Sequence, residues 1–444
     1  MAESLGPNYR KLFTASVISN LGDGVSQIGY PWLASAVTRN PVLVAVVAIA
    51  QRLPWLVFTL PAGVITDRVD RRRAMVLMDS IRAVLTAFVA IAVLGLGSEL
   101  PDPAHIEDIV GTRTGLYVIL VVTSLLLGFA EVLRDNSAQT IIPSIVESDQ
   151  LERANGRMWS AEQAANTFIG PPLGSLLIAV AFFLPFALDA ASFVASAALV
   201  ALIAGNFRPA PAPEPTPWKA DLKEGFGWLW HHSLLRPMAV ILGIINGLAA
   251  MQVATLVLFS QEVLHTTAFE FAVLTMGMAI GSIIGGVTAP RIRRRLGSGP
   301  SLYLTLVVSA VTSLVIGVLS SWPLVLVMFG LTALVGVVWN VITVSLRQTI
   351  IPDRLLGRVN SVYRFFAWGM MPIGTALGGV LVAVAEPIWG REMALRIPWF
   401  VTGVIGLALL VYAVPRLTTA RLEAAREEGV AAKKSESASV EVEV

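Results

Sequence analysis

Long apolar stretches separated by short polar segments repeat along the whole chain. A helix needs about 20 apolar residues to span the hydrocarbon core of a bilayer. Prolines inside such a stretch are tolerated, because neighbouring helices can satisfy the backbone groups that proline frees. The pattern therefore predicts an all-α polytopic membrane protein with twelve spans, at residues 13–37, 42–65, 74–97, 116–141, 158–181, 184–205, 237–260, 269–289, 301–320, 323–346, 359–384 and 397–414.

The polar segment 206–236 divides these stretches into two groups of six. We expect an N-terminal bundle over 1–205 and a C-terminal bundle over 237–414. The linker begins with a proline-rich spacer, 208–217, which favours an extended chain. It continues with apolar residues at helical spacing (Leu222, Phe226, Leu229 and Trp230), which predict an amphipathic helix at the inner membrane interface. The tail, 415–444, is polar and is predicted to be disordered.

Composition and charge limit the classes of protein to which the chain can belong. With 55% hydrophobic and only 14% charged residues, the chain cannot be an ordinary soluble protein. The absence of cysteine excludes a disulfide framework and a thiolate metal site. Placing the N-terminus in the cytoplasm assigns 23 of the 32 lysines and arginines to inner segments. The positive-inside rule therefore predicts that both termini are cytoplasmic, and the net charge of +2 needs no nucleic acid to explain it.

Three short motifs recur in the second half of the chain. Gln139-Thr-Ile-Ile-Pro143 returns as Gln348-Thr-Ile-Ile-Pro352, Arg153-Ala-Asn155 as Arg358-Val-Asn360, and Gly170-Pro-Pro-Leu-Gly174 as Gly374-Thr-Ala-Leu-Gly378. Their separations of 209, 205 and 204 positions agree closely. The two halves are therefore expected to be parallel structural repeats.

A hydrophilic turn between the second and third stretches carries four arginines in six residues. It reads Gly63-Val-Ile-Thr-Asp67-Arg68-Val-Asp-Arg71-Arg-Arg. A second copy, residues 286–295, begins 223 positions later, with Pro290 in place of the first aspartate. The pattern G-x-x-x-D-R-x-x-R-R resembles the signature loop between helices 2 and 3 of the major facilitator superfamily.

The resemblance is closest to the macrolide-efflux and enterobactin-exporter-like branch of that superfamily. It is carried by Ser19-Asn-Leu-Gly-Asp23, Gln51-Arg-Leu-Pro54, Asp79-x-x-Arg82, Leu151-Glu-Arg-Ala-Asn155 and Leu188-Asp-Ala-Ala-Ser-Phe193. It implies twelve helices in two six-helix repeats, secondary transport, and contact of Asp67 with the inner end of helix 11. Gly170-Pro171-x-x-Gly174 resembles the antiporter motif of helix 5, which implies export, although Asn166 replaces the first glycine of that motif.

In this superfamily helices 1, 4, 7 and 10 line the central cavity. The resemblance therefore implies that polar residues deep in those helices contact the substrate, although any of them could instead bond to a neighbouring helix. The candidates are Asn20, Asp23, Gln27, Glu131, Asn246, Gln252, Trp339, Asn340 and Thr343.

Charged residues inside the membrane are costly, so each needs a partner or a function. Asp23 and Arg52 both lie near the midplane, and we expect them to form an ion pair. Such a pair could simply pin helices 1 and 2. Alternatively, protonation of Asp23 could release Arg52 and couple proton movement to conformation.

A second charged group lies toward the cytoplasmic ends of helices 3 and 4: Asp79, Arg82, Glu131, Arg134 and Asp135. The i,i+3 pairs Asp79–Arg82 and Glu131–Arg134 can each meet along one helix face. This group is interpreted as a satisfied network at the inner mouth. Glu131 lies deeper than the others, which makes it a second candidate for proton exchange.

All six acidic residues inside predicted helices belong to the first half, so proton sites are expected there. The glycines and prolines of helix 5 can serve either bending or close packing. The four histidines fall in loops or the linker, and no metal-binding spacing or phosphate-binding loop is present. An enzyme, a cofactor and a metal site are therefore not expected.

The sequence thus predicts proton-coupled export of an amphipathic small molecule, such as a drug, a macrolide or a siderophore. The protein would act as a monomer in a bacterial cytoplasmic membrane, with protons, substrate and membrane lipids as its partners. Two alternatives stay open: a lipid or lysolipid translocase with the same fold, and a receptor or scaffold that does not transport.

Overall fold

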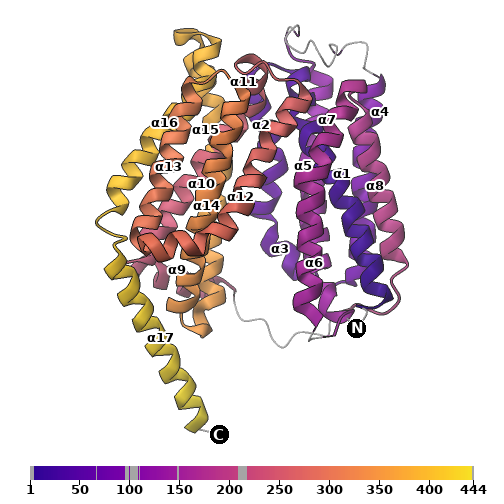
Figure 1. Cartoon of the computed structure of the whole chain (residues 1–444). Helices are drawn as coiled ribbons and strands as arrows, with labels where there is room; N and C mark the ends of the chain where they lie inside the picture. The colour runs from indigo at the N-terminus through magenta and orange to yellow at the C-terminus, as the bar shows by residue number, and fades with distance from the viewer. Residues whose placement is uncertain are drawn as a thin grey trace. The chain divides into compact units, whose positions relative to one another are not determined.

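The computed structural model describes residues 5–66, 68–95, 100, 109, 111–147, 150–208 and 218–442. Within these residues the regular secondary structure is helical, and an isolated bridge joins Thr38 and Thr112 (Figure 1). The helices are α1 (Pro7–Val37), α2 (Pro41–Val57), α3 (Thr59–Thr66), α4 (Arg71–Gly95), α5 (Thr114–Ile141), the 3₁₀ turn Ile142–Ser144, α6 (Leu151–Gln163), the π-helical turn Ala164–Ile169, α7 (Gly170–Val180), α8 (Leu184–Ala201), α9 (Trp218–His231), α10 (Leu235–Ala254), α11 (Leu256–Glu262), α12 (Ala268–Leu296), α13 (Ser298–Val318), α14 (Trp322–Ile350), α15 (Asp353–Trp389), α16 (Arg391–Ala413) and α17 (Thr419–Val442).

Each of the twelve predicted stretches coincides with one helix or with consecutive helical pieces. Among the described residues, nine helices are long and apolar enough to cross a membrane. The total of twelve spans stays a prediction. The outward face of α4 shows the surface expected in lipid, because Leu77, Val84 and Ile91 recur along it and are 57%, 70% and 66% exposed. Ala83, Thr86 and Ala90 on its other face are buried.

The chain forms two compact units. The first unit comprises Met1–Pro213 and Ala254–Val273, and the second comprises Glu214–Val253 and Leu274–Val444. Within the first unit, α11 is held by polar contacts at one end of α1. Arg39 forms an ion pair with Glu262 and donates to Gln261 Oε1 at 2.6 Å. Gln261 Nε2 donates in turn to Ser35 Oγ at 2.9 Å. The predicted division at residues 205 and 237 stays a prediction.

The predicted helix in the linker is present as α9. Its apolar side packs on the second unit, where Leu229 is buried in the core. The rings of Phe226 and Trp230 stack on Phe366 of α15. The proline-rich spacer before α9 lies outside the described residues, except for Arg208.

Two predicted segments differ from the structure. The second arginine run, predicted as a turn, lies in the last turn of α12, which continues to Leu296. Basic side chains are favourable there because the helix dipole is negative at that end. The chain turns one residue later, at Gly297 with φ 85°. The tail, predicted to be disordered, forms α17, which extends beyond the other helices of its unit (Figure 1). Its many alanine, glutamate and arginine residues are strong helix formers.

Candidate functional site

The centre of the first unit holds a buried arginine that joins α1 to α4. Arg82, on α4, is 3% exposed, and its Nη2 donates to Asp23 Oδ1 of α1 at 2.6 Å. Its Nη1 donates to Ser19 Oγ at 3.4 Å. The guanidinium also lies over the ring of Phe193 in α8, 3.9 Å from the ring centroid. Arg82 is therefore fixed by α1 and α8 as well as by its own helix.

A second buried arginine extends this cluster to α5. Arg134 Nε lies 3.5 Å from Asp79 Oδ1, and Arg82 Nη1 lies 3.5 Å from the same oxygen. The other oxygen of Asp79, a fully buried carboxylate, accepts from Ser196 Oγ at 2.7 Å. Both 3.5 Å contacts are charge pairings that lack hydrogen-bond geometry at Oδ1. Arg134 also pairs with Asp135 at 3.4 Å and donates to Ser16 Oγ. We call Asp23, Asp79, Arg82, Arg134 and Asp135 the charge network.

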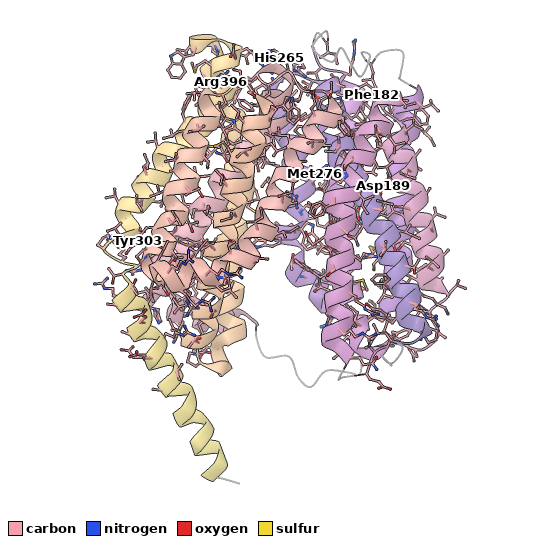
Figure 2. The ribbon with its side chains drawn as sticks, in the orientation of Figure 1. Phe182, Asp189, His265, Met276, Tyr303 and Arg396 are labelled. Atoms are coloured by element: carbon pink, nitrogen blue, oxygen red, sulfur yellow. The ribbon has the colours of Figure 1, made fainter. Side chains whose placement is uncertain are left out.

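Asp189, which Figure 2 labels, is on α8 and is 2% exposed, and it is close enough to Asp23 and Arg82 of the charge network to interact with them electrostatically. Its Oδ2 accepts from Ser26 Oγ at 2.6 Å, and its Oδ1 accepts from Ser192 Oγ at 3.4 Å. Among the described residues, no cation lies within ion-pair distance of it. Gly22 on α1 makes room for these groups, since a Cβ there would lie 2.4 Å from Asp189 Oδ1.

Sequence reasoning did not select Asp189 or the serines as site residues. Ser16, Ser19, Asp23 and Ser26 are spaced by three or four residues, so they share one face of α1. That polar stripe in an apolar helix is a signal that the sequence contains. It faces α4, α5 and α8, which supply the other members of the network.

Two predicted ion pairs are not formed among the described residues. Asp23 pairs with Arg82 instead of Arg52, and Arg52 is exposed. Asp23 and Arg52 were expected to pair because they lie at the same depth in the membrane. The side chain of Asp23 points toward α4 instead, where it meets Arg82. Arg134 pairs with Asp79 and Asp135, whereas Glu131 is half-buried and makes no ion pair. The Asp79–Arg82 pair is present.

We call the arginine-rich segment 63–73 the arginine turn. Two of its arginines cap the ends of neighbouring helices. Arg71 Nη1 donates to Thr140 O at the end of α5, at 2.8 Å. Arg72 Nη1 donates to Ile203 O after the end of α8, at 2.7 Å. Carbonyls at helix ends lack intrahelical partners and carry partial negative charge, so cations satisfy them well. Arg68 is exposed. Asp67 lies outside the described residues, so its predicted contact stays untested, and Gly63 lies within α3.

The glycine-proline motif marks a close crossing of two helices. The predicted fifth helix consists of α6, the π-helical turn and α7. Gly170 N–H donates to Ala165 O, five residues back, just before Pro171, which has no N–H. A Cβ on Gly170 would lie 2.5 Å from Gly24 Cα, and one on Gly174 would lie 2.4 Å from Val25 O. These glycines therefore let α7 touch the backbone of α1.

Several of the substrate-contact candidates bond to neighbouring helices. Asn20 Oδ1 accepts from Asn166 Nδ2 at 2.8 Å, Asn246 Nδ2 donates to Ala367 O at 2.8 Å, and Gln252 Nε2 donates to Ser313 Oγ at 3.0 Å. Trp339 and Thr343 are buried, at 2% and 1% exposure. Gln27 and Asn340 are exposed and Glu131 is half-exposed, which leaves these three, with Asp23, most accessible.

A cavity of about 1000 Å³ opens between α1 and α6 in the first unit. Tyr9 and Phe13 stack along its wall, 6.0 Å between ring centroids. Arg10, Arg153 and Arg157 also line it. The combination of aromatic rings and cations suits an amphipathic ligand, and the volume is large enough for a drug-sized one.

Comparisons with known proteins agree with this architecture. The chain is 25% identical over 421 residues to the multidrug efflux pump Tap of Mycolicibacterium fortuitum, covering 91% of this chain and 96% of that protein. It is 25% identical over 411 residues to the enterobactin exporter EntS of Shigella boydii serotype 4, covering 91% and 92%.

Solved structures share the fold. A bacterial homologue of the iron transporter ferroportin, in an inward-facing state, superposes with a TM-score of 0.67 at 16% identity, covering 93% of this chain and 100% of that chain. The nucleoside transporter NupG gives 0.67 at 11% identity, covering 93% and 99%. The sequence profile described as "Transmembrane secretion effector" matches residues 5–433. The chain thus belongs to the transmembrane secretion effector family of major facilitator permeases, which are transporters and not enzymes.

Proposed function

We propose that this permease exports an amphipathic small molecule in exchange for protons, by alternating access in a bacterial cytoplasmic membrane. The single observation that supports proton coupling is that one carboxylate of the charge network, Asp23, is accessible to water. The side chain of Asp23 is 30% exposed, whereas its partner Arg82 is 3% exposed. A coupling carboxyl must reach water and still respond to its surroundings, and Asp23 has both properties.

The charge balance of the cluster supports the proposal. Asp23, Asp79, Asp135, Asp189 and Glu131 surround two arginines, Arg82 and Arg134. The carboxyls therefore outnumber the guanidinium groups, and the cluster can take up a proton while each arginine keeps a partner. Asp23 can release Arg82 without leaving it unpaired, because Asp79 and Ser19 still contact it.

Export rather than uptake is proposed from the relatives, which are named as an efflux pump and an exporter. The aromatic and basic cavity between α1 and α6 supports an amphipathic substrate. We further propose that both termini are cytoplasmic, since the arginine turn and the basic residues of α12 then lie on the inner side. The protein is proposed to act as a monomer.

The experiment is to reconstitute the chain in proteoliposomes and to measure substrate binding and pH-gradient-driven flux separately. A panel of fluorescent amphipathic drugs serves as substrate, and a labelled lysolipid tests the translocase alternative. Asp23→Asn should abolish gradient-driven flux, a loss of at least about tenfold, and leave substrate binding within about twofold. Glu131→Gln should reduce flux less.

The matched control is Glu427→Gln, which removes an exposed carboxylate of α17, outside the charge network. Normal flux in Asp23→Asn together with loss in Glu131→Gln would move the coupling site to Glu131. Normal flux in both variants would refute proton coupling through this network. Flux of the lysolipid alone would favour the translocase.

A further inference from the structure

The arginine turn also forms one wall of a cavity of about 760 Å³ in the first unit. Four arginines line it: Arg68 comes from the turn before α4, Arg72 and Arg73 from the first turn of α4, and Arg208 follows α8. We call this cavity the arginine-turn pocket. The charge network does not contribute to it, so the transport proposal leaves it unexplained.

The pocket carries excess positive charge. Asp70 is its only acidic lining residue among those the structure describes, and its carboxylate accepts from the backbone N–H of Arg73. Arg72 donates to Ile203 O. In the described part of the chain, the side chains of Arg68, Arg73 and Arg208 form no ion pair and are exposed. Three guanidinium groups thus converge on one cavity with their hydrogen-bond donors available for an anion.

The wall of the pocket along α4 is apolar. Leu77 and Met78 line it, and Leu77 is 57% exposed. From Leu77 the exposed apolar stripe of α4 continues through Ile81, Val84, Phe88 and Ile91. An occupant that satisfies both surfaces has an anionic group at the arginines and an apolar chain along α4. A free inorganic anion would leave the apolar wall uncovered.

The second unit also contains a basic cavity, with a different set of arginines. This smaller cavity, of about 280 Å³, is lined by Arg293 and Arg294 of α12 and by Arg426 and Glu423 of α17. Leu133 of α5 lines the first pocket, and Ile342 of α14, 209 positions later, lines the second. That separation is also the separation of the Gln-Thr-Ile-Ile-Pro repeats. A basic cavity beside the corresponding position of α5 and α14 is thus present in both units.

We infer that the arginine-turn pocket binds the headgroup of an anionic phospholipid, with the acyl chains lying along α4. The guanidinium groups of Arg73 and Arg208 bind the phosphate in this assignment. Arginine is well suited to the task because its planar fork of donors matches phosphate oxygens. A basic site beside the membrane surface attracts anionic lipid over zwitterionic lipid.

The test uses the purified full-length chain and native mass spectrometry, with phosphatidylglycerol and phosphatidylcholine of identical acyl chains as probes. The wild-type protein should retain one phosphatidylglycerol at least about tenfold better than phosphatidylcholine. Arg73→Gln combined with Arg208→Gln should remove that preference. Arg73→Lys, which keeps the charge, should retain most of it.

The matched control is Arg416→Gln. Arg416 is exposed, donates to Tyr412 O, and lines neither pocket. Its substitution should leave the lipid preference unchanged. Equal retention of both lipids by the wild-type chain, or unchanged retention of phosphatidylglycerol in the double variant, would overturn the inference. Displacement of the lipid by millimolar inorganic phosphate would also overturn it, because the site would then recognise the anion alone.

Discussion

The two units carry different side chains at matching positions of their repeated helices. Asp23 in α1 and Asn246 in α10 are 223 positions apart, the same separation as the two arginine runs. Glu131 and Arg134 of α5 lie 209 positions before Asn340 and Thr343 of α14. In each case a charged residue of the first unit corresponds to a neutral polar residue of the second. The neutral residues are sufficient for packing, because Asn246 joins α10 to α15 with one hydrogen bond.

The close contacts between helix backbones, in contrast, occur at corresponding positions in both units. Gly24 faces Gly170 in the first unit, and Gly247, 223 positions after Gly24, faces Gly374 in the second. The repeat therefore preserves the close helix contacts and changes the ionisable groups. Since a bundle of this kind packs without ions at these positions, the charges of the first unit are explained better by a role in transport than by folding.

The largest expected effect comes from removing the central cation of the charge network. Arg82→Gln leaves Asp79 and Asp23 without one of their cationic partners inside the bundle. Breaking a buried pair in this way costs about 3–5 kcal/mol of folding free energy. Thermal unfolding in detergent should show a large drop in the midpoint for this variant.

The control lies in the second unit. Thr305 is 223 positions after Arg82 and donates its hydroxyl to Ser301 O and Val335 O. Thr305→Val should cost about 1 kcal/mol, the usual net contribution of a hydrogen bond. If the two variants lose similar amounts of unfolding free energy, the charged residues of the first unit contribute no more to stability than the neutral polar residues of the second. The proposed difference between the two units would then be wrong.

The glycine crossings should respond alike in both units. In Gly170→Ala the new Cβ would lie 2.5 Å from Gly24 Cα, and in Gly374→Ala it would lie 1.9 Å from Gly247 O. Both variants should lose about 1–3 kcal/mol, because backbone must move to make room. Gly336→Ala is the control, since nothing lies within 4 Å of its Cβ and alanine favours the helix of α14. A loss in only one unit would show that the crossings are not equivalent.

The positions of the helices could be predicted from the sequence because apolar length alone sets them. The interruptions within the helices could not be predicted as accurately from the sequence. The π-helical turn before Pro171 depends on how α7 meets α1, which one sequence does not reveal. The helical course of the second arginine run does not follow from its likeness to the first copy, and Pro290, which lies within α12, gives no sign of it in the sequence.

The members of the charge network could be predicted individually, but not their pairing. Asp79 and Arg82 lie on one helix, so their spacing fixed the contact. The sequence placed Arg52 at the depth of Asp23 and Arg82 nearer the cytoplasmic end, yet Asp23 pairs with Arg82 because its side chain points toward α4. Asp189 was overlooked because its partners are serines, and a serine in an apolar helix is common. Only the alignment of four polar positions along α1 distinguishes Ser16, Ser19 and Ser26.

The smallest expected effect concerns how two corresponding helices, α1 and α10, begin. α1 starts at Pro7 after Gly6 and has no side-chain cap. At the start of α10, His232 Nδ1 accepts from the backbone N–H groups of Leu234 and Leu235, both at 3.2 Å. Only the neutral imidazole can accept there. Burial lowers the pKa of His232 below its usual 6.5, and Glu428 of α17 offsets part of that effect.

Because the folded-state pKa of His232 is depressed, its cap contributes fully above about pH 6.5 and is lost as the pH falls through the folded-state value. Thermal unfolding of the wild-type chain from pH 7.5 to pH 5 should show this loss, about 1 kcal/mol, the usual contribution of a helix cap. His232→Asn keeps a capping oxygen but does not titrate, so wild type and variant should be similarly stable at pH 7.5, and the wild type should become the less stable of the two as the pH falls. A difference independent of pH would mean that His232 does not cap α10 through its neutral ring, and α10 would then begin uncapped, as α1 does.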